Sequence, residues 1–290
     1  PMVAWAAMAA RSVTWVAAGQ PWRSDAVGCP SCESRILYEG ETWRCSAACG
    51  LERPDPEVWL EGELVRTGAG EAVGLRLALP GRFNRANAAM AAVAAGFMGV
   101  PLQEALGAMA SVATVGGRYD VVRLASGHLD VDARLLLAKN PAGWAELLQL
   151  LDPAPTPVVV AINARIADGR DPSWLWDVPF EALRGRPVVA CGERWRDLAV
   201  RLRYADVDHV AMTDALAGLV EVTGGGRWTG RRQPTTAQPH RASGGGDLPV
   251  RVDVIANYTA FQELRLQLAR AGARSVVGRS PLAQATGGGG

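Results

Sequence analysis

Four of the five cysteines lie close together in the sequence, in two pairs: Cys29 with Cys32, and Cys45 with Cys49. Two such pairs joined by a short span can place four thiolates tetrahedrally around zinc, and four protein ligands leave no open position for catalysis. Clustering in a chain with so little other cysteine also favours a metal site over a disulfide framework. We therefore predict a structural zinc ribbon over residues 28–52, with free or disulfide-bonded cysteines as the alternative.

A second chemical group is the polar segment 163–177, which follows the continuous apolar run 157–162. Such a run is typical of a buried parallel strand. The segment carries Asp168, Asp171 and Asp177 together with two tryptophans. Acidic groups on a loop after a buried strand indicate a functional role. The alternative is a solvated turn with the tryptophans packed beneath it.

Two further positions could bind anions or a nucleotide. Lys139, the one lysine of the chain, and Asn140 stand where a strand turns into a helix, and a helix N-terminus favours a carboxylate or phosphate. Asn84 and Asn87 are three residues apart, so they share one helical face, and their amides could contact an adenine edge or a ribose. For these two the alternative is an N-cap, at Asn84, plus a surface asparagine.

Charge and hydropathy narrow the function classes. The net charge is +1, which argues against nucleic acid as a partner. The apolar run Met2 to Ala10 is shorter than the roughly 20 residues that a membrane span needs, so we expect no integral membrane protein. The charges of 192–204 could be plain surface pairs on a helix. Cys191 falls on an expected strand and is interpreted as a buried small hydrophobe.

The elements that must position these residues alternate between strands and helices. The expected strands are 12–18, 58–66, 72–79, 119–124, 129–137, 157–162, 187–191 and 252–256. The expected helices are 1–10, the run from Asn84 to Met98, one after Pro101, and 141–151, 195–203, 211–222 and 259–272. This pattern predicts an α/β fold with a doubly wound parallel sheet. Sites in such sheets lie at the carboxyl ends of strands, here after Leu137 and after Ile162.

Length and composition suggest two domains. We expect one over 1–113, containing the ribbon, and a Rossmann-like α/β domain over 114–278. Within the second domain, 223–249 is rich in glycine, arginine and small polar residues and is interpreted as a flexible insert. Residues 279–290 end in four glycines and are interpreted as a disordered tail.

Taken together, these segments resemble the MurT family, whose members have a Mur-ligase central domain with an inserted four-cysteine ribbon and a distinctive C-terminal domain. The similar stretches occur in family order: CPSC…CSAAC, LPGRFNRANAAMA, LLLAKNPAGW, INARIADGRDPSWLWDVPFE, GERWRDLAVRLRYA and NYTAFQELR. The fold implied is a partial Mur-ligase central domain with a zinc ribbon, followed by a Rossmann-like C-terminal domain.

The resemblance also implies a function. Such proteins are cytoplasmic and act at the inner face of the membrane. With a GatD-like glutaminase subunit they convert the D-glutamate α-carboxyl of the lipid II stem peptide to D-isoglutamine. The synthetase subunit uses ATP with Mg²⁺ to form an acyl phosphate, which ammonia from glutamine displaces; most of that work is charge clamping and positioning.

The resemblance carries roles to particular residues. It places Asn84 and Asn87 near the nucleotide, Arg118 at an interdomain nucleotide contact, and Lys139 with Asn140 at the turn facing the reacting carboxyl. It further implies that Asp168, Asp171 or Asp177 completes the glutaminase's Cys–His pair as a triad acid. Which of the three does so stays open at this point.

One family feature is absent from the sequence: it contains no GxxxxGK[ST] phosphate loop. Because the chain also starts with Pro1, we interpret it as a fragment that by itself does not form the acyl phosphate. Two other hypotheses remain: a Mur-type amino-acid ligase without a glutaminase, and a non-catalytic zinc-ribbon binding module on a decayed ligase scaffold. Failure to co-purify with a glutaminase would favour the ligase, and retained activation of a glutaminase would argue against the binding module.

Overall fold

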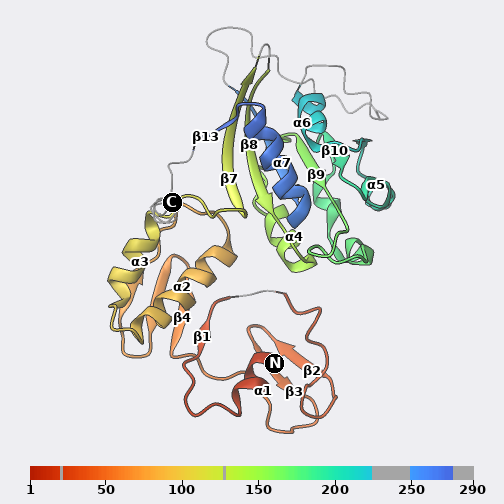
Figure 1. Ribbon diagram of the computed structural model, residues 1–290. Helices are drawn as coiled ribbons and strands as arrows, with labels where there is room; N and C mark the ends of the chain where they lie inside the picture. The colour runs from red at the N-terminus through yellow and green to blue at the C-terminus, as the bar shows by residue number, and fades with distance from the viewer. Residues whose placement is uncertain (20–21, 127–128, 224–248, 277–290) are drawn as a thin grey trace. The chain divides into compact units, whose positions relative to one another are not determined.

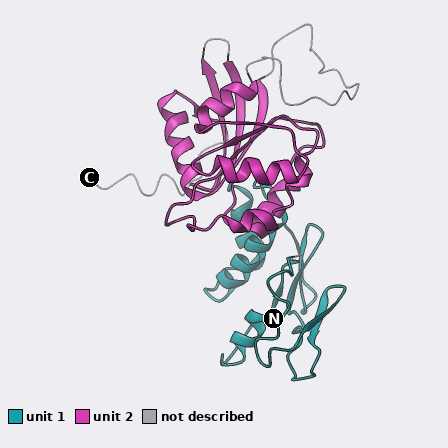
Figure 2. Cartoon of the chain, turned by 90° about the vertical axis from the view of Figure 1, so that its right-hand side faces the viewer, with its two compact units in different colours: residues 1–112 teal, residues 113–290 magenta. Residues whose placement is uncertain are grey.

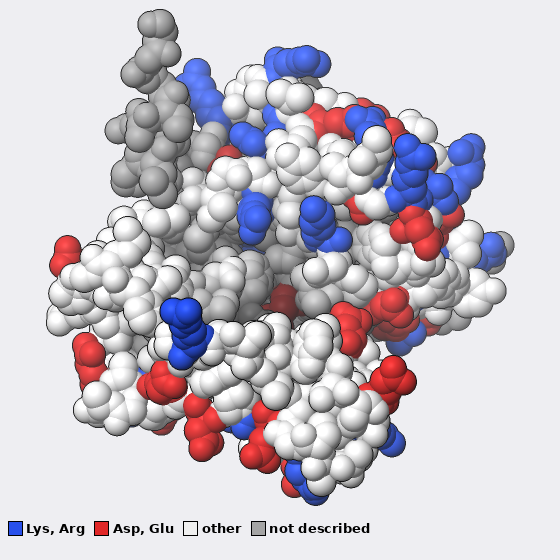
Figure 3. All heavy atoms as spheres, turned by 60° about the horizontal axis from the view of Figure 1, so that its bottom comes forward, with Lys and Arg blue, Asp and Glu red and all other residues white. Residues whose placement is uncertain are grey.

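The computed structural model describes residues 1–19, 22–126, 129–223 and 249–276 (Figure 1). The chain divides into two compact units, Pro1–Val112 and Ala113–Gly290 (Figure 2). None of the helices in the described ranges is long and apolar enough to cross a bilayer. On the face drawn in Figure 3, basic and acidic side chains both occur among a largely uncharged surface.

The first part of unit 1 is a small ribbon. Strands β2 (Ile36–Glu39) and β3 (Thr42–Cys45) form an antiparallel hairpin. The short helix α1 (Met2–Ala7) contributes Ala4 to the same apolar cluster as Ile36 and Leu51, with two aromatic side chains, Tyr38 and Trp43, packed against it. A core this small cannot stabilise much by itself, which is why such ribbons depend on a metal.

The second part of unit 1 is a sheet in the order β1-β4-β5-β6, comprising Val16–Ala17, Val58–Glu61, Leu64–Thr67 and Ala72–Gly74. Helices α2 (Arg82–Gly96) and α3 (Leu102–Ala110) share its apolar core, largely through small alanines that allow close approach.

Two expectations about unit 1 are wrong in kind, and the strands expected over 12–18 and 72–79 are shorter, at Val16–Ala17 and Ala72–Gly74. The single strand expected over 58–66 is a hairpin, because Gly62 adopts φ 60° and lets Glu61 pair directly with Leu64. The long helix starts at Arg82 after Gly81, so Asn84 is not its N-cap. Instead, Asn84 Nδ2 donates to the carbonyl of Pro80 at 2.6 Å.

Unit 2 contains one sheet in the order β11-β10-β9-β12-β8-β7-β13. Its strands are β7 (Tyr119–Ser126), β8 (Leu129–Leu137), β9 (Val158–Ala161), β10 (Val188–Cys191), β11 (His209–Ala211), β12 (Val250–Ala256) and β13 (Arg274–Ser275). The five strands from β11 to β8 are parallel, as expected. The sheet is nevertheless mixed, because β7 joins β8 as an antiparallel hairpin and β13 pairs antiparallel with β7.

Helices cover both faces of this sheet, as Figure 1 shows for α7. One face packs against α6 (Ala215–Thr223) and α7 (Tyr258–Arg270) through alternate strand residues such as Val159, Ala161 and Val254. The other elements are α4 (Pro141–Leu148), the 3₁₀ helices η1 (Ser173–Asp177) and η2 (Phe180–Leu183), and α5 (Trp195–Tyr204). Both α4 and α5 contact η1 and η2.

In unit 2, one expected helix starts later than predicted, and two expected segments lie wholly or largely outside the described residues. The helix expected over 211–222 begins only at Ala215, because Ala211 completes β11. The insert expected over 223–249 overlaps α6 at Thr223, and its residues 224–248 lie outside the described part of the chain. The tail expected over 279–290 lies outside it as well.

Candidate functional site

The parallel strands of unit 2 end at one edge of the sheet. Ala256 at the end of β12 pairs with Leu137 of β8 and with Ala161 of β9, which in turn pairs with Cys191 of β10. The segments that follow these strands therefore converge, and they contain most of the polar residues singled out in the sequence. Because ligands of doubly wound folds bind at this edge, it is the candidate site of unit 2.

Two buried asparagines lie at the centre of this edge. Asn163 follows β9 and is 3% exposed, and Asn257 follows β12 and is 1% exposed. Asn257 Oδ1 accepts from Asn163 N at 3.0 Å, and Asn257 Nδ2 donates to the Asn163 carbonyl at 2.6 Å. The chain leaves β9 and β12 in opposite directions, toward β10 and toward β13. The Asn257 side chain thus bonds both backbone groups of Asn163, at the point between neighbouring strands where a doubly wound sheet changes direction.

The Asn163 side chain extends the link to two more elements. Its Oδ1 accepts from the backbone N–H of Glu193, after β10, at 2.9 Å. Its Nδ2 donates to Thr259 Oγ1 at 3.1 Å and to Glu263 Oε2 at 3.0 Å, both on α7. Since every donor and acceptor on this buried amide has a partner, Asn163 connects the loops after β9 and β10 to the start of α7.

Asp168 has a structural partner. Its Oδ1 accepts from Thr259 N at 2.9 Å and its Oδ2 from Thr259 Oγ1 at 2.5 Å. Asn257 occupies the N-cap of α7 without making a side-chain capping bond, because its amide serves Asn163 instead. Asp168 therefore caps α7 from a distant loop, where a carboxylate also complements the helix dipole.

Asp171 and Asp177 are both exposed and are held differently. Asp171 accepts from the backbone N–H and the hydroxyl of Ser173, each at 2.9 Å. These two hydrogen bonds, with a smaller contribution from Arg194, hold the pKa of the Asp171 carboxyl below its usual value. Asp171 is thus an ionised carboxylate in a locally fixed turn, facing solvent. Asp177 is the last residue of η1.

The end of the loop is fixed by Arg201, which the sequence suggested as a surface charge. It is 6% exposed, and its guanidinium donates to the carbonyls of Leu175 at 3.2 Å and Val178 at 2.7 Å. It also pairs with Glu181 at 2.9 Å. The surface-pair interpretation is therefore wrong for Arg201, whereas Arg194 and Asp197 do form an exposed i,i+3 pair at 2.7 Å.

The two tryptophans of the loop 163–177 are placed differently: one fits a solvated turn with tryptophans packed beneath it, and the other does not. Trp174 packs on the buried Trp144 with ring centroids 6.1 Å apart. Trp176 stays 53% exposed and meets Tyr204 edge-on. One tryptophan therefore packs beneath the loop, while the other lies at the surface.

Lys139 and Asn140 follow β8 and are exposed. Asn140 is the N-cap of α4, and its Oδ1 accepts from Gly143 N at 2.9 Å. Arg118, also exposed, has its carbonyl bonded to Leu137 N at 2.9 Å, which brings its backbone next to the same strand end. The two basic residues thus belong to one corner of unit 2. The Asn84 and Asn87 positions lie on α2 of unit 1, half-buried and exposed respectively.

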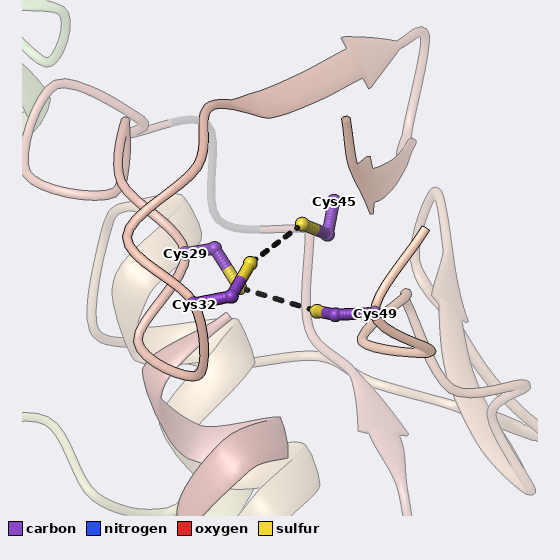
Figure 4. Close-up of side chains that lie close together, drawn as sticks. All are labelled: Cys29, Cys32, Cys45 and Cys49. Atoms are coloured by element: carbon purple, nitrogen blue, oxygen red, sulfur yellow. Dashed lines mark hydrogen bonds between the residues drawn. The ribbon is translucent and has the colours of Figure 1, made fainter. Parts of the chain in front are cut away.

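The four cysteines of the ribbon converge in unit 1 (Figure 4). Their sulfur atoms all lie within 4.8 Å of one another. The Cys29–Cys49 and Cys32–Cys45 pairs are 3.6 Å and 3.4 Å apart. Metal–sulfur bonds of about 2.3 Å in a tetrahedron give sulfur–sulfur edges of about 3.8 Å. The donor set and its spacing therefore fit a tetrahedral metal ion.

Local backbone geometry explains why the thiols converge. In the first turn Glu33 N donates to the Cys29 carbonyl at 2.8 Å, with Glu33 in the left-handed region at φ 62°. Hydrogen bonds from Ser34, side chain and backbone, together with one from Cys45, lower the pKa of the Cys32 thiol to about 6. Cys29 and Cys45 are buried. Cys191 lies apart in unit 2, where burial and then Asp214 raise the pKa of its thiol to about 12, as expected of an inert core cysteine.

Comparison with known proteins finds a family match within unit 2. Residues 137–223 match the family described as MurT ligase C-terminal. The chain contains a MurT ligase C-terminal domain. The sequence resemblance to MurT is thereby confirmed, and the matched residues run from the end of β8 to the end of α6. They include Lys139, Asn140 and the three loop aspartates.

Two similar proteins are named lipid II isoglutaminyl synthase (glutamine-hydrolyzing) subunit MurT. The one from Streptococcus pneumoniae is 30% identical over 63% of this chain and 43% of its own length. The one from Staphylococcus aureus is 35% identical over 27% of this chain and 19% of its own length. The similarity therefore spans less than half of either MurT protein.

The fold comparison extends over more of the chain. A pseudomurein peptide ligase type C from Methanothermus fervidus matches with a TM-score of 0.51 at 17% identity, over 83% of this chain and 49% of that one. At this identity the likeness shows the fold alone. It agrees with the expected α/β architecture.

Proposed function

We propose that this chain belongs to the synthetase subunit of a glutamine-dependent amidotransferase that converts the D-glutamate α-carboxyl of lipid II to D-isoglutamine. The proposal rests on the MurT C-terminal match and on the curated MurT relatives, whose names state a glutamine-hydrolysing lipid II isoglutaminyl synthase. A GatD-like glutaminase would be its partner. The place of action would be the cytoplasmic face of the membrane, where the headgroup of lipid II would be presented.

The observation that carries the proposal is the presentation of Asp171. A glutaminase that lacks its own triad acid needs a carboxylate that is ionised, held in one orientation and accessible to a histidine of another chain. Asp171 is exposed, is fixed by Ser173 and has a lowered pKa. Asp168 is half-buried, and its two oxygens are bonded by Thr259 of another element, α7, whereas those of the exposed Asp171 are bonded only within its own turn. We therefore assign the triad role to Asp171, with Asp168 in a supporting role.

The other candidate residues would serve the synthetase reaction. ATP, with Mg²⁺, would supply the phosphoryl group that turns the unreactive carboxylate into an acceptor for ammonia. Asn84 and Asn87 would contact the nucleotide, and Arg118 and Lys139 would offset negative charge on phosphate and carboxylate. Asn140 would act indirectly, because its side chain caps α4 and so fixes the turn that carries Lys139.

The four cysteines would hold a structural Zn²⁺. The cluster supplies four thiol ligands, leaving no coordination position for a substrate. Zinc would therefore stabilise the ribbon and take no part in the transfer of nitrogen.

The deciding experiment measures glutamate release from glutamine by the GatD-like partner, with and without this chain. Asp168, Asp171 and Asp177 are each changed to asparagine, which keeps side-chain size and removes the charge. We expect the native chain to stimulate hydrolysis and Asp177→Asn to retain the stimulation. Asp171→Asn should lower the stimulated rate by up to about 10⁴-fold, the order of the loss when a triad carboxylate becomes an amide.

Two results would count against this proposal. If the native chain binds the partner but stimulates nothing, the glutamine-dependent role is wrong and a ligase without a glutaminase gains support. If stimulation survives Asp171→Asn but not Asp177→Asn, the family assignment holds and the triad assignment to Asp171 is wrong.

A further inference from the structure

The hydroxyl of Thr259 lies between a buried amide and a loop carboxylate. Asn163 Nδ2 is 3.1 Å from Thr259 Oγ1, and Thr259 Oγ1 is 2.5 Å from Asp168 Oδ2. Asn163 follows β9, Asp168 lies farther along the same loop, and Thr259 lies in the first turn of α7. Thr259 is far from the other two in the chain, 96 positions from Asn163 and 91 from Asp168.

Chemistry fixes the direction of both hydrogen bonds. An amide nitrogen can only donate, and an ionised carboxylate can only accept. The orientation of the Asn163 amide is set by its Oδ1, which accepts from Glu193 N. The single hydroxyl proton of Thr259 must therefore point to Asp168, while a hydroxyl lone pair accepts from Asn163. The chain Asn163–Thr259–Asp168 has one consistent arrangement and no freedom to reverse.

This chain of bonds ends three residues before Asp171. Asp168 also accepts from Arg165 N at 3.3 Å, which closes the turn 165–168. On the other side, Arg201 fixes the carbonyls of Leu175 and Val178. The segment that presents Asp171 is thus tied to the rigid sheet edge at its start and to α5 at its end.

We propose that Thr259 is a positioning residue for the glutaminase-activating loop: its hydroxyl transmits the fixed geometry of the Asn163–Asn257 pair to Asp168 and so sets the place of the Asp171 carboxylate. This inference rests on the proposed function. It adds that activation depends on a residue of α7 that has no contact with the reacting groups and lies beyond the matched MurT C-terminal residues.

The test compares Thr259→Val with Thr259→Ser in the complex of this chain with the partner glutaminase. Valine keeps the shape and removes the hydroxyl; serine keeps the hydroxyl and removes a methyl. We expect Thr259→Val to lower the stimulated kcat about 10-fold or more, because displacements of about 1 Å near reacting groups are costly, with KM for glutamine within about twofold. Thr259→Ser should retain native kcat.

Thr223→Val is the matched control, because Thr223 Oγ1 donates to backbone carbonyls of its own helix, α6. It should leave kcat unchanged at a similar change in Tm. A native kcat for Thr259→Val, or an equal loss in Thr259→Ser, would overturn the inference. Failure of the proposed function looks different, since the unmodified chain would then give no stimulation to compare.

A double-mutant cycle with Asp168→Asn shows whether Thr259 affects kcat through Asp168 or independently of it. If Thr259 acts through Asp168, the two changes together should reduce kcat no more than the larger single change. If the two reductions in kcat multiply in the double variant, the residues act independently, and the proposed action of Thr259 through Asp168 is wrong.

Discussion

One buried side chain, Arg201, fixes the end of the loop 163–177. Its position on α5 suggested a surface pair, yet the guanidinium is buried and bonds two carbonyls of a neighbouring segment. It also lies over the rings of Trp176 and Phe180, at 5.8 and 5.6 Å from their centroids. A planar cation with several donors suits this task because it can satisfy backbone and carboxylate together.

We predict that Arg201→Ala lowers the free energy of unfolding of unit 2 by about 2–4 kcal/mol, because buried carbonyls and Glu181 lose a charged donor. Urea denaturation followed by tryptophan fluorescence would measure this. Arg203→Ala, on the exposed side of the same helix, should change stability by less than about 0.5 kcal/mol. Equal losses in the two variants would contradict a role specific to the buried site.

At the scale of elements, the carboxyl ends of the strands depend on one glycine. Gly192 follows β10 with φ 91°, and a Cβ there would lie 2.4 Å from the carbonyl oxygen of Ile162. The same carbonyl accepts from Arg194 N at 2.9 Å. Close contact between the loops after β9 and β10 therefore requires that no side chain intervene, and this contact brings Glu193 to Asn163.

Gly192→Ala should destabilise unit 2 by more than about 3 kcal/mol, the sum of a left-handed backbone penalty and a backbone clash. Gly185→Ala supplies the comparison: Gly185 has φ 77° but open space around a Cβ. Its cost should be about 1–2 kcal/mol, from the backbone conformation alone. Thermal unfolding of both variants tests the prediction, and similar Tm values would refute it.

Much of this edge could be predicted from the sequence, and the reasons are local. The apolar runs of β9 and β10 and the Asn140-Pro141 start of α4 carry their signals within a few residues. The sequence analysis predicts one strand over 58–66 and not the hairpin of β4 and β5, because the run is β-prone apart from the single Gly62. The Asn163–Asn257 pair could not be predicted, because it depends on β12 lying beside β9. A signal existed: each asparagine directly follows a buried strand.

At the scale of the whole molecule, the ribbon and unit 2 have separate cores. The ribbon core contains Cys29, Cys45, Ile36 and Leu51, and the main core of unit 2 shares no residue with it. Loss of a metal should therefore unfold the ribbon and leave the sheet of unit 2 intact.

We expect one zinc per chain by native mass spectrometry. A strong chelator should release it, expose four thiols to a thiol reagent, and shift the emission of Trp15 and Trp43, which pack on the ribbon core. Cys191→Ser should keep the metal, because that thiol lies in unit 2. A chain purified without metal whose four ribbon thiols stay protected would contradict the prediction.

The place of β12 has a consequence for how the protein is made. This strand lies between β8 and β9 and pairs with both, although it follows them by most of the length of unit 2. During synthesis, β8 and β9 leave the ribosome without the neighbour that joins them, and each presents an open edge to other chains. Since Asn257 and Thr259 follow β12 in the chain, the loop 163–177 can take its final shape only after β12 and the start of α7 have been made. A nascent chain stalled before residue 250 should therefore need a chaperone, whereas one extended past α7 should not.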